Sequence, residues 1–172
     1  LRGLALEDEP GVRRFAVLGM MREKGEAILH PPSADPTLVA AYPLDQEKLA
    51  GYRDALAAAG IPFETAIVVQ SFNTQAEMQV AAALLLGRLG GATAILAMSD
   101  RLAVALLTEA TLRGIRIPSD LSVVGFDDAY SARTSSPPLT TVSQDVTEKG
   151  RIAARILLSG EIRSVTVPVR LV

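Results

Sequence analysis

The feature that most constrains the fold is the alternation of short apolar runs with longer helical segments. The runs are rich in β-branched residues, which is typical of parallel strands covered on both faces. The segments between them carry helix-boundary residues: Thr74 and Glu77 have the spacing of a capping box, and Gly114 can end the helix that Ser99 can cap. Such alternation predicts βαβ units, and therefore an α/β fold with a parallel sheet flanked by helices.

The predicted strands of this alternating part are residues 14–19, 66–70, 93–97 and 121–125, and the predicted helices are 45–59, 74–89 and 100–113. Asp45 is expected to cap the first helix. Residues 20–44 contain several prolines and are predicted to form a long irregular loop. After residue 134 the rhythm changes to an extended piece at 139–142, a helix at 145–158 and a closing strand at 165–172.

Composition excludes several classes of protein. The 172 residues are 49% hydrophobic and 21% charged, which indicates a globular chain. The net charge is −2 and no Lys/Arg cluster is present, so direct DNA contact by this chain is not expected. There is no cysteine, and the single histidine, His30, cannot build a metal cluster. Without a long apolar stretch or a signal pattern, we expect a cytoplasmic protein with no membrane contact, metal or cofactor.

Catalytic motifs are missing. The sequence has no GxGxxG fingerprint, no GxxxxGK[ST] phosphate loop and no GxSxG elbow. His30 lies in the proline-rich loop without a nucleophile to pair with. Asp127 and Asp128 could imitate a magnesium site, but nothing in the sequence implies a phosphate partner. We therefore expect a binding protein and not an enzyme.

Polar side chains follow the predicted parallel strands where each strand ends. Asp127 and Asp128 end the run SVVGFDD, Ser99 and Asp100 follow the preceding strand, and Phe72 follows the strand before that. Because ligands of open α/β sheets bind at the carboxyl ends of the strands, these side chains are expected to converge on one rim. Carboxylates and hydroxyls beside a flat apolar ring suit a sugar, and the ring could equally cover a nucleoside base.

Structural roles for the same residues remain open. Ser99 is also a plausible helix cap, Asp100 is favoured in a first helical turn, and Phe72 could belong to the core. Asp128 could cap a loop. Asp127 is best explained as a ligand-binding residue, because two adjacent acids after a buried strand are electrostatically unfavourable without a partner.

A longer pattern resembles a known family. The run AILAMSDRLAVALLTEATLRGIRIPSDLSVVGFDD, followed by PPLTTVSQDVTEKGRIAARILLSGE, resembles the lac/gal repressor (LacI/GalR) family of bacterial transcription regulators. The resemblance implies a two-lobed, periplasmic-binding-protein-like type I core. It also implies that a sugar or purine-like effector binds between the lobes, and that DNA is bound only by a helix-turn-helix headpiece absent from this chain.

The resemblance assigns roles to individual positions. Asp127 matches the effector-binding aspartate of the family, Ser99 a polar effector contact, and Phe72 the aromatic wall. Lys48 falls where an arginine is common, which replaces a bidentate donor with a point charge. Val12 falls where a histidine is common, and the 20–44 connection is longer than usual.

The resemblance also divides the chain. Residues 11–128 and 165–172 are expected to form the C-terminal lobe almost completely, and residues 139–160 to belong to an N-terminal lobe that is otherwise missing. The apolar stripe of Ile152, Ile156 and Leu157 is then expected to lack its usual cover. A periplasmic sugar-binding protein of a transport system shares this fold and is the alternative function.

The helix predicted over residues 100–113 is apolar nearly all round, so it must be covered on two sides. The sheet can cover one side, and the other could face a second subunit or the lobe itself. The family places a two-fold interface at this helix and at the segment after the SVVGFDD strand. We therefore expect a homodimer, and the predicted interface residues are Leu102, Ala103, Leu106, Ala110 and Tyr130.

Overall fold

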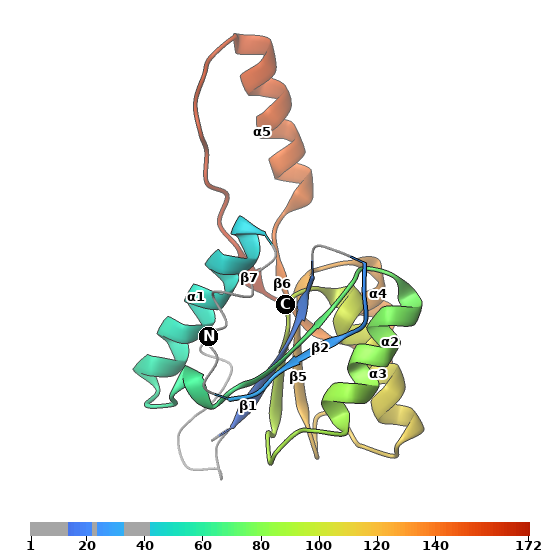
Figure 1. Ribbon diagram of the computed structural model, residues 1–172. Helices are drawn as coiled ribbons and strands as arrows, with labels where there is room; N and C mark the ends of the chain where they lie inside the picture. Colours follow the sequence, from blue (N-terminus) through green and yellow to red (C-terminus); the bar gives the residue numbers. More distant parts are fainter. Residues whose placement is uncertain (1–13, 22–23, 33–41) are drawn as a thin grey trace.

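The computed structural model describes residues 14–21, 24–32 and 42–172. Its strands form a seven-stranded sheet with the order β2-β3-β1-β4-β5-β6-β7 (Figure 1). The strands are β1 (Phe15–Met20), β2 (Ile28–His30), β3 (Ile67–Ser71), β4 (Ala94–Ala97), β5 (Ser122–Asp127), β6 (Thr140–Ser143) and β7 (Arg170–Leu171). The helices are α1 (Pro43–Ala58), α2 (Gln75–Leu86), α3 (Asp100–Leu112), α4 (Tyr130–Thr134) and α5 (Val146–Ser159), with a 3-10 turn, η2 (Phe63–Thr65). Predictions for Val12 and for much of the 20–44 loop fall outside the described residues.

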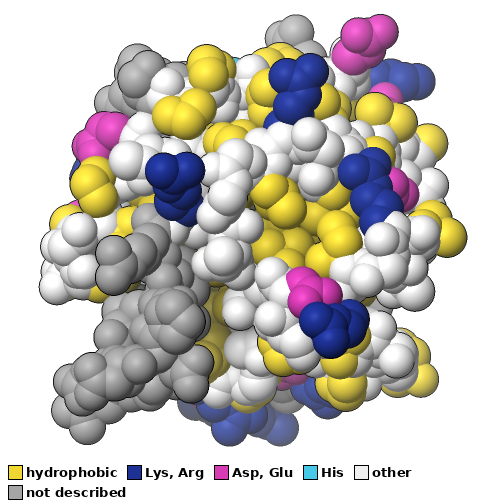
Figure 2. Space-filling model, turned by 90° about the horizontal axis from the view of Figure 1, so that it is seen from below, with side chains coloured by type: hydrophobic (Ala, Val, Ile, Leu, Met, Phe, Trp, Pro, Cys, Tyr) yellow, Lys and Arg dark blue, Asp and Glu magenta, His cyan; other side chains and the backbone are white. Residues whose placement is uncertain are grey.

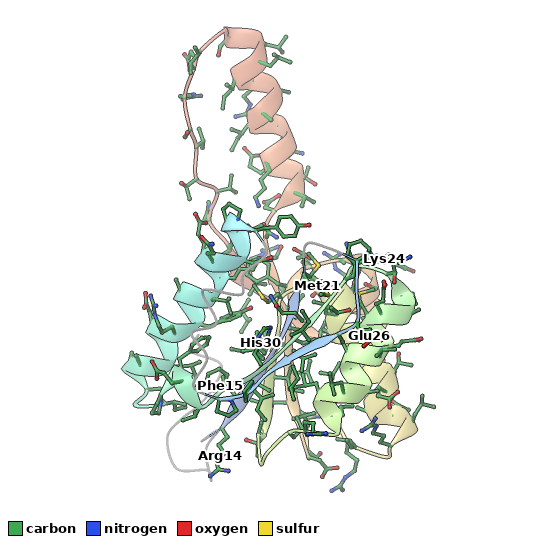
Figure 3. The ribbon with its side chains drawn as sticks, in the orientation of Figure 1. Arg14, Phe15, Met21, Lys24, Glu26 and His30 are labelled. Atoms are coloured by element: carbon green, nitrogen blue, oxygen red, sulfur yellow. The ribbon has the colours of Figure 1, made fainter. Side chains whose placement is uncertain are left out.

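The centre of the sheet is parallel, as the alternation predicts. Strands β3, β1, β4, β5 and β6 run in the same direction, and β2 and β7 lie antiparallel at the two edges. The predicted α/β fold is therefore confirmed. Strand β1 runs upward from Arg14 to Met21 in Figure 3, so the carboxyl ends of the parallel strands lie along the upper edge in that view.

Helices cover both faces of the sheet, and the residues of β1 alternate between them. Ala16 and Leu18 belong to the core formed with α2 and α3. Phe15 and Val17 belong to the core on the α1 side, together with Leu49 of α1. This two-residue period is the expected consequence of strand geometry, and it buries β1 on both faces. Figure 1 shows α1 on one side of the sheet and α2 and α3 on the other.

Helix α3 is buried by its own chain, which corrects the predicted dimer interface. Leu102, Ala103, Leu106 and Ala110 have 0% exposed surface and lie in the core with α2 and the sheet. Side chains without exposed surface cannot contact a second copy, so these four residues do not form an interface in this arrangement. Of the predicted interface residues, Tyr130 on α4 is accessible, with 82% of its surface exposed.

Helix α5 and the segment after it project away from the sheet (Figure 1). None of its residues is buried, and Leu157 is 81% exposed, so its predicted apolar stripe does lack a full cover. Ile152 and Ile156 share a shallow groove with Val165 and Val167 of the returning segment. The predicted closing strand is therefore too long: its pairing with β6 begins at Arg170, because the residues before it leave the sheet beside α5.

Of the residues predicted to mark the starts of helices α1 and α2, one is confirmed and one is wrong. The Thr74 hydroxyl oxygen accepts a hydrogen bond from the Glu77 N–H, which confirms the predicted capping box. Asp45 does not cap α1: the helix begins earlier, at Pro43, and Asp45 lies inside its first turn. Strand β2 and helix α4 have no counterpart among the predicted elements.

Candidate ligand-binding site

The carboxyl ends of four adjacent parallel strands bring the predicted site residues to the same edge of the sheet. In the order β3, β1, β4, β5, these strands end at Ser71, Met20, Ala97 and Asp127. Ser99 follows the end of β4 by two residues, and Asp127 is itself the last residue of β5. This edge is where open α/β sheets bind ligands.

Asp127 is half-buried at this edge. Its backbone has a φ of 122°, a conformation that side-chain-bearing residues rarely adopt. Its Oδ1 accepts a hydrogen bond of 2.7 Å from Gln144 Nε2, just beyond β6. Burial raises the pKa of the Asp127 carboxyl, the positive charge of Lys48 opposes that rise, and the negative charge of Asp100 adds to it. Asp127 is therefore a carboxylate whose charge its own surroundings compensate only in part.

Lys48 lies on α1 and reaches the same edge of the sheet. Its Nζ donates a hydrogen bond of 2.9 Å to the Met98 carbonyl, directly after β4. The same ammonium lies 4.2 Å from the centre of the Phe126 ring, next to Asp127. A carbonyl and an aromatic face both attract a cation, so these two contacts can hold the ammonium in place. Among the described residues, no ion pair joins Lys48 to a carboxylate.

Ser99 and Asp100 have structural partners. Ser99 is buried, and its Oγ accepts a hydrogen bond from the Leu102 N–H at the start of α3. Asp100 is 0% exposed; its Oδ2 accepts a 2.6 Å hydrogen bond from the Ala129 N–H, and its Oδ1 accepts one of 2.5 Å from the Thr141 hydroxyl. These contacts favour the capping role of Ser99 and make Asp100 a link between α3 and the strands beside it.

Phe72 follows β3 and is half-buried. Its carbonyl accepts hydrogen bonds from the Thr74 N–H and the Ser71 hydroxyl, which fix the turn between β3 and α2. Within the described part of the chain, no hydrogen bond or ring contact joins Phe72 to Lys48 or Asp127. The structure thus brings Lys48 and Asp127 together and places Phe72 on the same edge, without a direct contact to them.

Three further residues, which the sequence does not single out, belong to this neighbourhood. Gln144 bonds to Asp127 and accepts a 2.5 Å hydrogen bond from Lys149 Nζ of α5. Tyr52 lies on the face of α1 that carries Lys48. Burial raises the pKa of Tyr52 strongly, and the negative charges of Asp127 and Asp45 raise it further. The helical spacing of Lys48 and Tyr52 was a usable signal, whereas nothing local marks Gln144.

Asp128 has a structural partner in the helix that follows it. Its carboxylate accepts two hydrogen bonds from the Arg133 guanidinium, of 3.0 and 2.9 Å. The hydrogen bonds from Arg133 and Ser143 lower the pKa of Asp128. The two adjacent acids therefore differ: Asp128 fixes α4, and Asp127 faces the site.

Other features of the described residues also bear on the choice of function. Figure 2 shows the face seen from below, where hydrophobic side chains gather in a patch bordered by basic ones. His30 on β2 is hydrogen-bonded to Gln70 at 2.9 Å. Among residues 14–21, 24–32 and 42–172, no cluster of three or more His, Cys, Asp or Glu side chains could hold a metal ion. The helices of these same residues are too short or too polar to cross a membrane.

Comparison with known proteins agrees with the fold. The family described as "Periplasmic binding protein-like domain" matches residues 9–168. The chain is 38% identical over 106 residues to the HTH-type transcriptional regulator DegA of Bacillus subtilis, covering 62% of this chain and 31% of DegA. It is 38% identical over 126 residues to the HTH-type transcriptional regulator CelR of Thermobifida fusca, covering 73% of this chain and 37% of CelR.

Solved structures of transcriptional regulators resemble this chain in fold. The complex of a transcriptional regulator CelR with cellobiose has a TM-score of 0.73 at 29% identity, covering 95% of this chain and 46% of that one. A LacI-family transcriptional regulator from Burkhoderia phymatum has a TM-score of 0.72 at 26% identity, covering 92% and 53%. The chain thus spans about a third of the length of these curated relatives and about half of these solved chains.

Proposed function

The chain belongs to the periplasmic binding protein-like domain family, in the form carried by LacI-type regulators, and from this membership we propose that it senses an effector for a transcriptional repressor. Its relatives are regulators by name and not enzymes. Those names favour regulation over the alternative of a periplasmic transport protein, which the shared fold leaves open.

The observation that carries the proposal is that the Lys48 ammonium and the Asp127 carboxylate reach the same carboxyl edge of the sheet. The Lys48 ammonium, fixed by the Met98 carbonyl and the Phe126 ring, can donate to a ligand oxygen. The half-buried Asp127 carboxylate can accept from neighbouring hydroxyls. One donor and one acceptor beside an aromatic ring form a site for a hydroxyl-rich small molecule, such as a sugar.

We propose that the effector acts by shifting a population of conformations. The chain leaves the sheet after β6, forms α5 and returns to the sheet at β7, so these two connections can change the orientation of the α5 part. Gln144 bonds to Asp127 and accepts from Lys149 of α5, which joins the site to that part. A ligand that binds one orientation more tightly would shift the equilibrium towards it.

The partners follow from the same proposal. DNA would be bound by another domain of such a regulator, because this chain carries a net charge of −2. A homodimer remains a proposal, with its interface at the exposed Tyr130 and not at the buried residues of α3. We propose that Asp127, Lys48, Ser99 and Phe72 contact the effector, and that the regulator acts in the cytoplasm.

Thermal unfolding of the chain with cellobiose and with D-ribose tests the proposal. Binding to the folded state at one hundred times Kd stabilises a protein by about 2.7 kcal/mol, so an effector should raise the Tm in a concentration-dependent way. The Asp127→Asn variant should lose this rise, and the control Asp54→Asn, whose side chain is 78% exposed on α1, should keep it. The proposal is contradicted if the sugar still raises the Tm of Asp127→Asn, or if no neutral sugar raises the Tm of the unchanged chain.

A further inference from the structure

The amino ends of the parallel strands form the edge of the sheet opposite the candidate ligand-binding site. Arg14 precedes β1, and its carbonyl accepts a hydrogen bond from the Thr93 N–H, while the Thr93 carbonyl accepts one from the Ser122 N–H. These bonds place the starts of β1, β4 and β5 side by side. The loops that lead into β4 and β5, residues 87–93 and 113–121, therefore lie together on this face, which Figure 2 shows from below.

Hydrophobic side chains are accessible on this face (Figure 2). Leu112, the last residue of α3, is 78% exposed. Leu89, Ile115 and Ile117 pack against the core but are only partly buried. We call these four side chains the basal patch. An accessible apolar patch bordered by charged residues is typical of an interaction surface.

Arginines gather beside the basal patch, at the loop that follows α2. Arg113 donates a hydrogen bond of 3.0 Å to the Ala83 carbonyl near the end of α2. Arg14 donates one of 2.9 Å to the Gly90 carbonyl in the loop itself. Arg88 lies in the same loop and is exposed. Three arginines are thus held at or near one short loop, next to accessible apolar side chains.

Positive charge is in excess at this loop, although the chain as a whole has a net charge of −2. Arg113 is compensated, because it forms an ion pair of 2.7 Å with Glu109. No carboxylate among the residues that the structure describes forms an ion pair with Arg14 or Arg88. These two guanidiniums can therefore accept carboxylates from another molecule, in the bidentate geometry that arginine favours.

We propose that the basal patch is a docking surface for a second protein, which binds through a segment that combines acidic side chains with an apolar one. The apolar side chain would cover Leu112 and its neighbours, and the carboxylates would pair with Arg14 and Arg88. A nucleic acid would satisfy the arginines but would leave the apolar side chains uncovered, so the observations favour a protein segment. The surface lies at the edge opposite Lys48 and Asp127, so a partner there does not compete with an effector at the carboxyl edge.

A ¹H–¹⁵N NMR titration of the intact chain with a peptide of four Glu-Glu-Leu repeats tests the proposal. At millimolar concentration the peptide should shift the amide signals of residues 87–91 and 112–117. A peptide of four Lys-Lys-Leu repeats should leave them unchanged, because its charge has the same sign as the arginines. Absent shifts with the glutamate peptide, or equal shifts with both peptides, overturn the proposal. Equal or larger shifts with a DNA duplex would indicate a nucleic acid partner and would overturn it as well.

Two variants test the charged and the apolar part of the surface separately. Arg88→Glu should weaken binding of the glutamate peptide about tenfold, because attraction becomes repulsion, and Leu112→Ala should weaken it about threefold. Both side chains are exposed, so the Tm should stay nearly unchanged. The matched control is Arg151→Glu on α5, a 62% exposed arginine whose reversal changes the net charge equally and should leave the affinity unchanged. Unchanged affinity in either test variant, or an equal loss in Arg151→Glu, overturns the proposal.

Discussion

Replacing Asp100 with alanine should lower the free energy of unfolding by about 4 kcal/mol, because this carboxylate joins α3 to β6 and to the start of α4. Its two oxygens accept hydrogen bonds from the Ala129 N–H and the Thr141 hydroxyl, ahead of α4 and within β6. The carboxylate lies against Gly125 of β5, where even a Cβ atom would collide with it. Asp100 thus supports the end of β5, from which Asp127 projects.

The magnitude follows from those two bonds. A hydrogen bond to a charged group contributes about 1.5–3 kcal/mol, so two such bonds contribute about 3–6 kcal/mol. Ala129 is only half-buried, and water can replace its lost partner, which favours the lower half of that range. Thr141 is 1% exposed, and Thr141→Val removes only one of the two bonds, so it should cost about 2 kcal/mol. The double variant should lose less free energy of unfolding than the two single variants together, because Asp100→Ala and Thr141→Val both remove the bond between these residues.

Urea unfolding followed by far-UV circular dichroism measures these values. Asp54→Ala serves as the control, because its side chain is 78% exposed and it should unfold like the wild type. If Asp100→Ala has the same midpoint as Asp54→Ala, the carboxylate does not hold this part of the sheet together. Purely additive effects of Asp100→Ala and Thr141→Val would mean that the two residues do not interact.

Three further predictions concern the core and the acidic residues. Gly125→Ala should cost about 1–3 kcal/mol in urea unfolding, because the added methyl group collides with the Asp100 carboxylate; a neutral effect would mean that the site end of β5 can move aside. Leu106→Ala should cost about 2–5 kcal/mol and Leu112→Ala less than about 0.5 kcal/mol, because the first side chain is 0% and the second 78% exposed. Equal costs would contradict the burial of α3. The pKa of Asp128 is lowered by an arginine, so its stabilisation is present at neutral pH and is lost as the pH falls through that lowered pKa. The Tm of Asp128→Asn should therefore lie below that of the wild type at pH 7 and approach it in acid. A difference in Tm that does not change with pH would refute this stabilising role of Asp128.

The sequence predicted the parallel core well, because long periodic segments carry redundant signals. The helix predicted over residues 100–113 is α3, Asp100–Leu112, and its cap at Ser99 is present. Strand β2 has three residues and is held by its antiparallel pairing with β3, which no local pattern reveals. The short helix α4 has five residues, which is too few to carry a periodic signal, and its Arg133 pairs with Asp128 just before it.

The candidate site was predictable only in part. Asp127 follows from its place at the end of a buried strand, whereas Lys48 came from the family resemblance. Asp45 was misjudged as a helix cap because α1 begins two residues earlier, at Pro43. The predicted interface on α3 failed for a different reason: an all-round apolar helix can be covered by its own chain, and α2 provides that cover.

A crystal structure of the chain with a neutral sugar, soaked as cellobiose, tests the central claim most directly. The account predicts the sugar at the carboxyl edge of the sheet, with its hydroxyls on the Asp127 carboxylate and an oxygen near the Lys48 ammonium. A sugar bound instead at the other end of α1, beside Arg53 and Phe63, would contradict the account, because the effector would then not bind at Lys48 and Asp127.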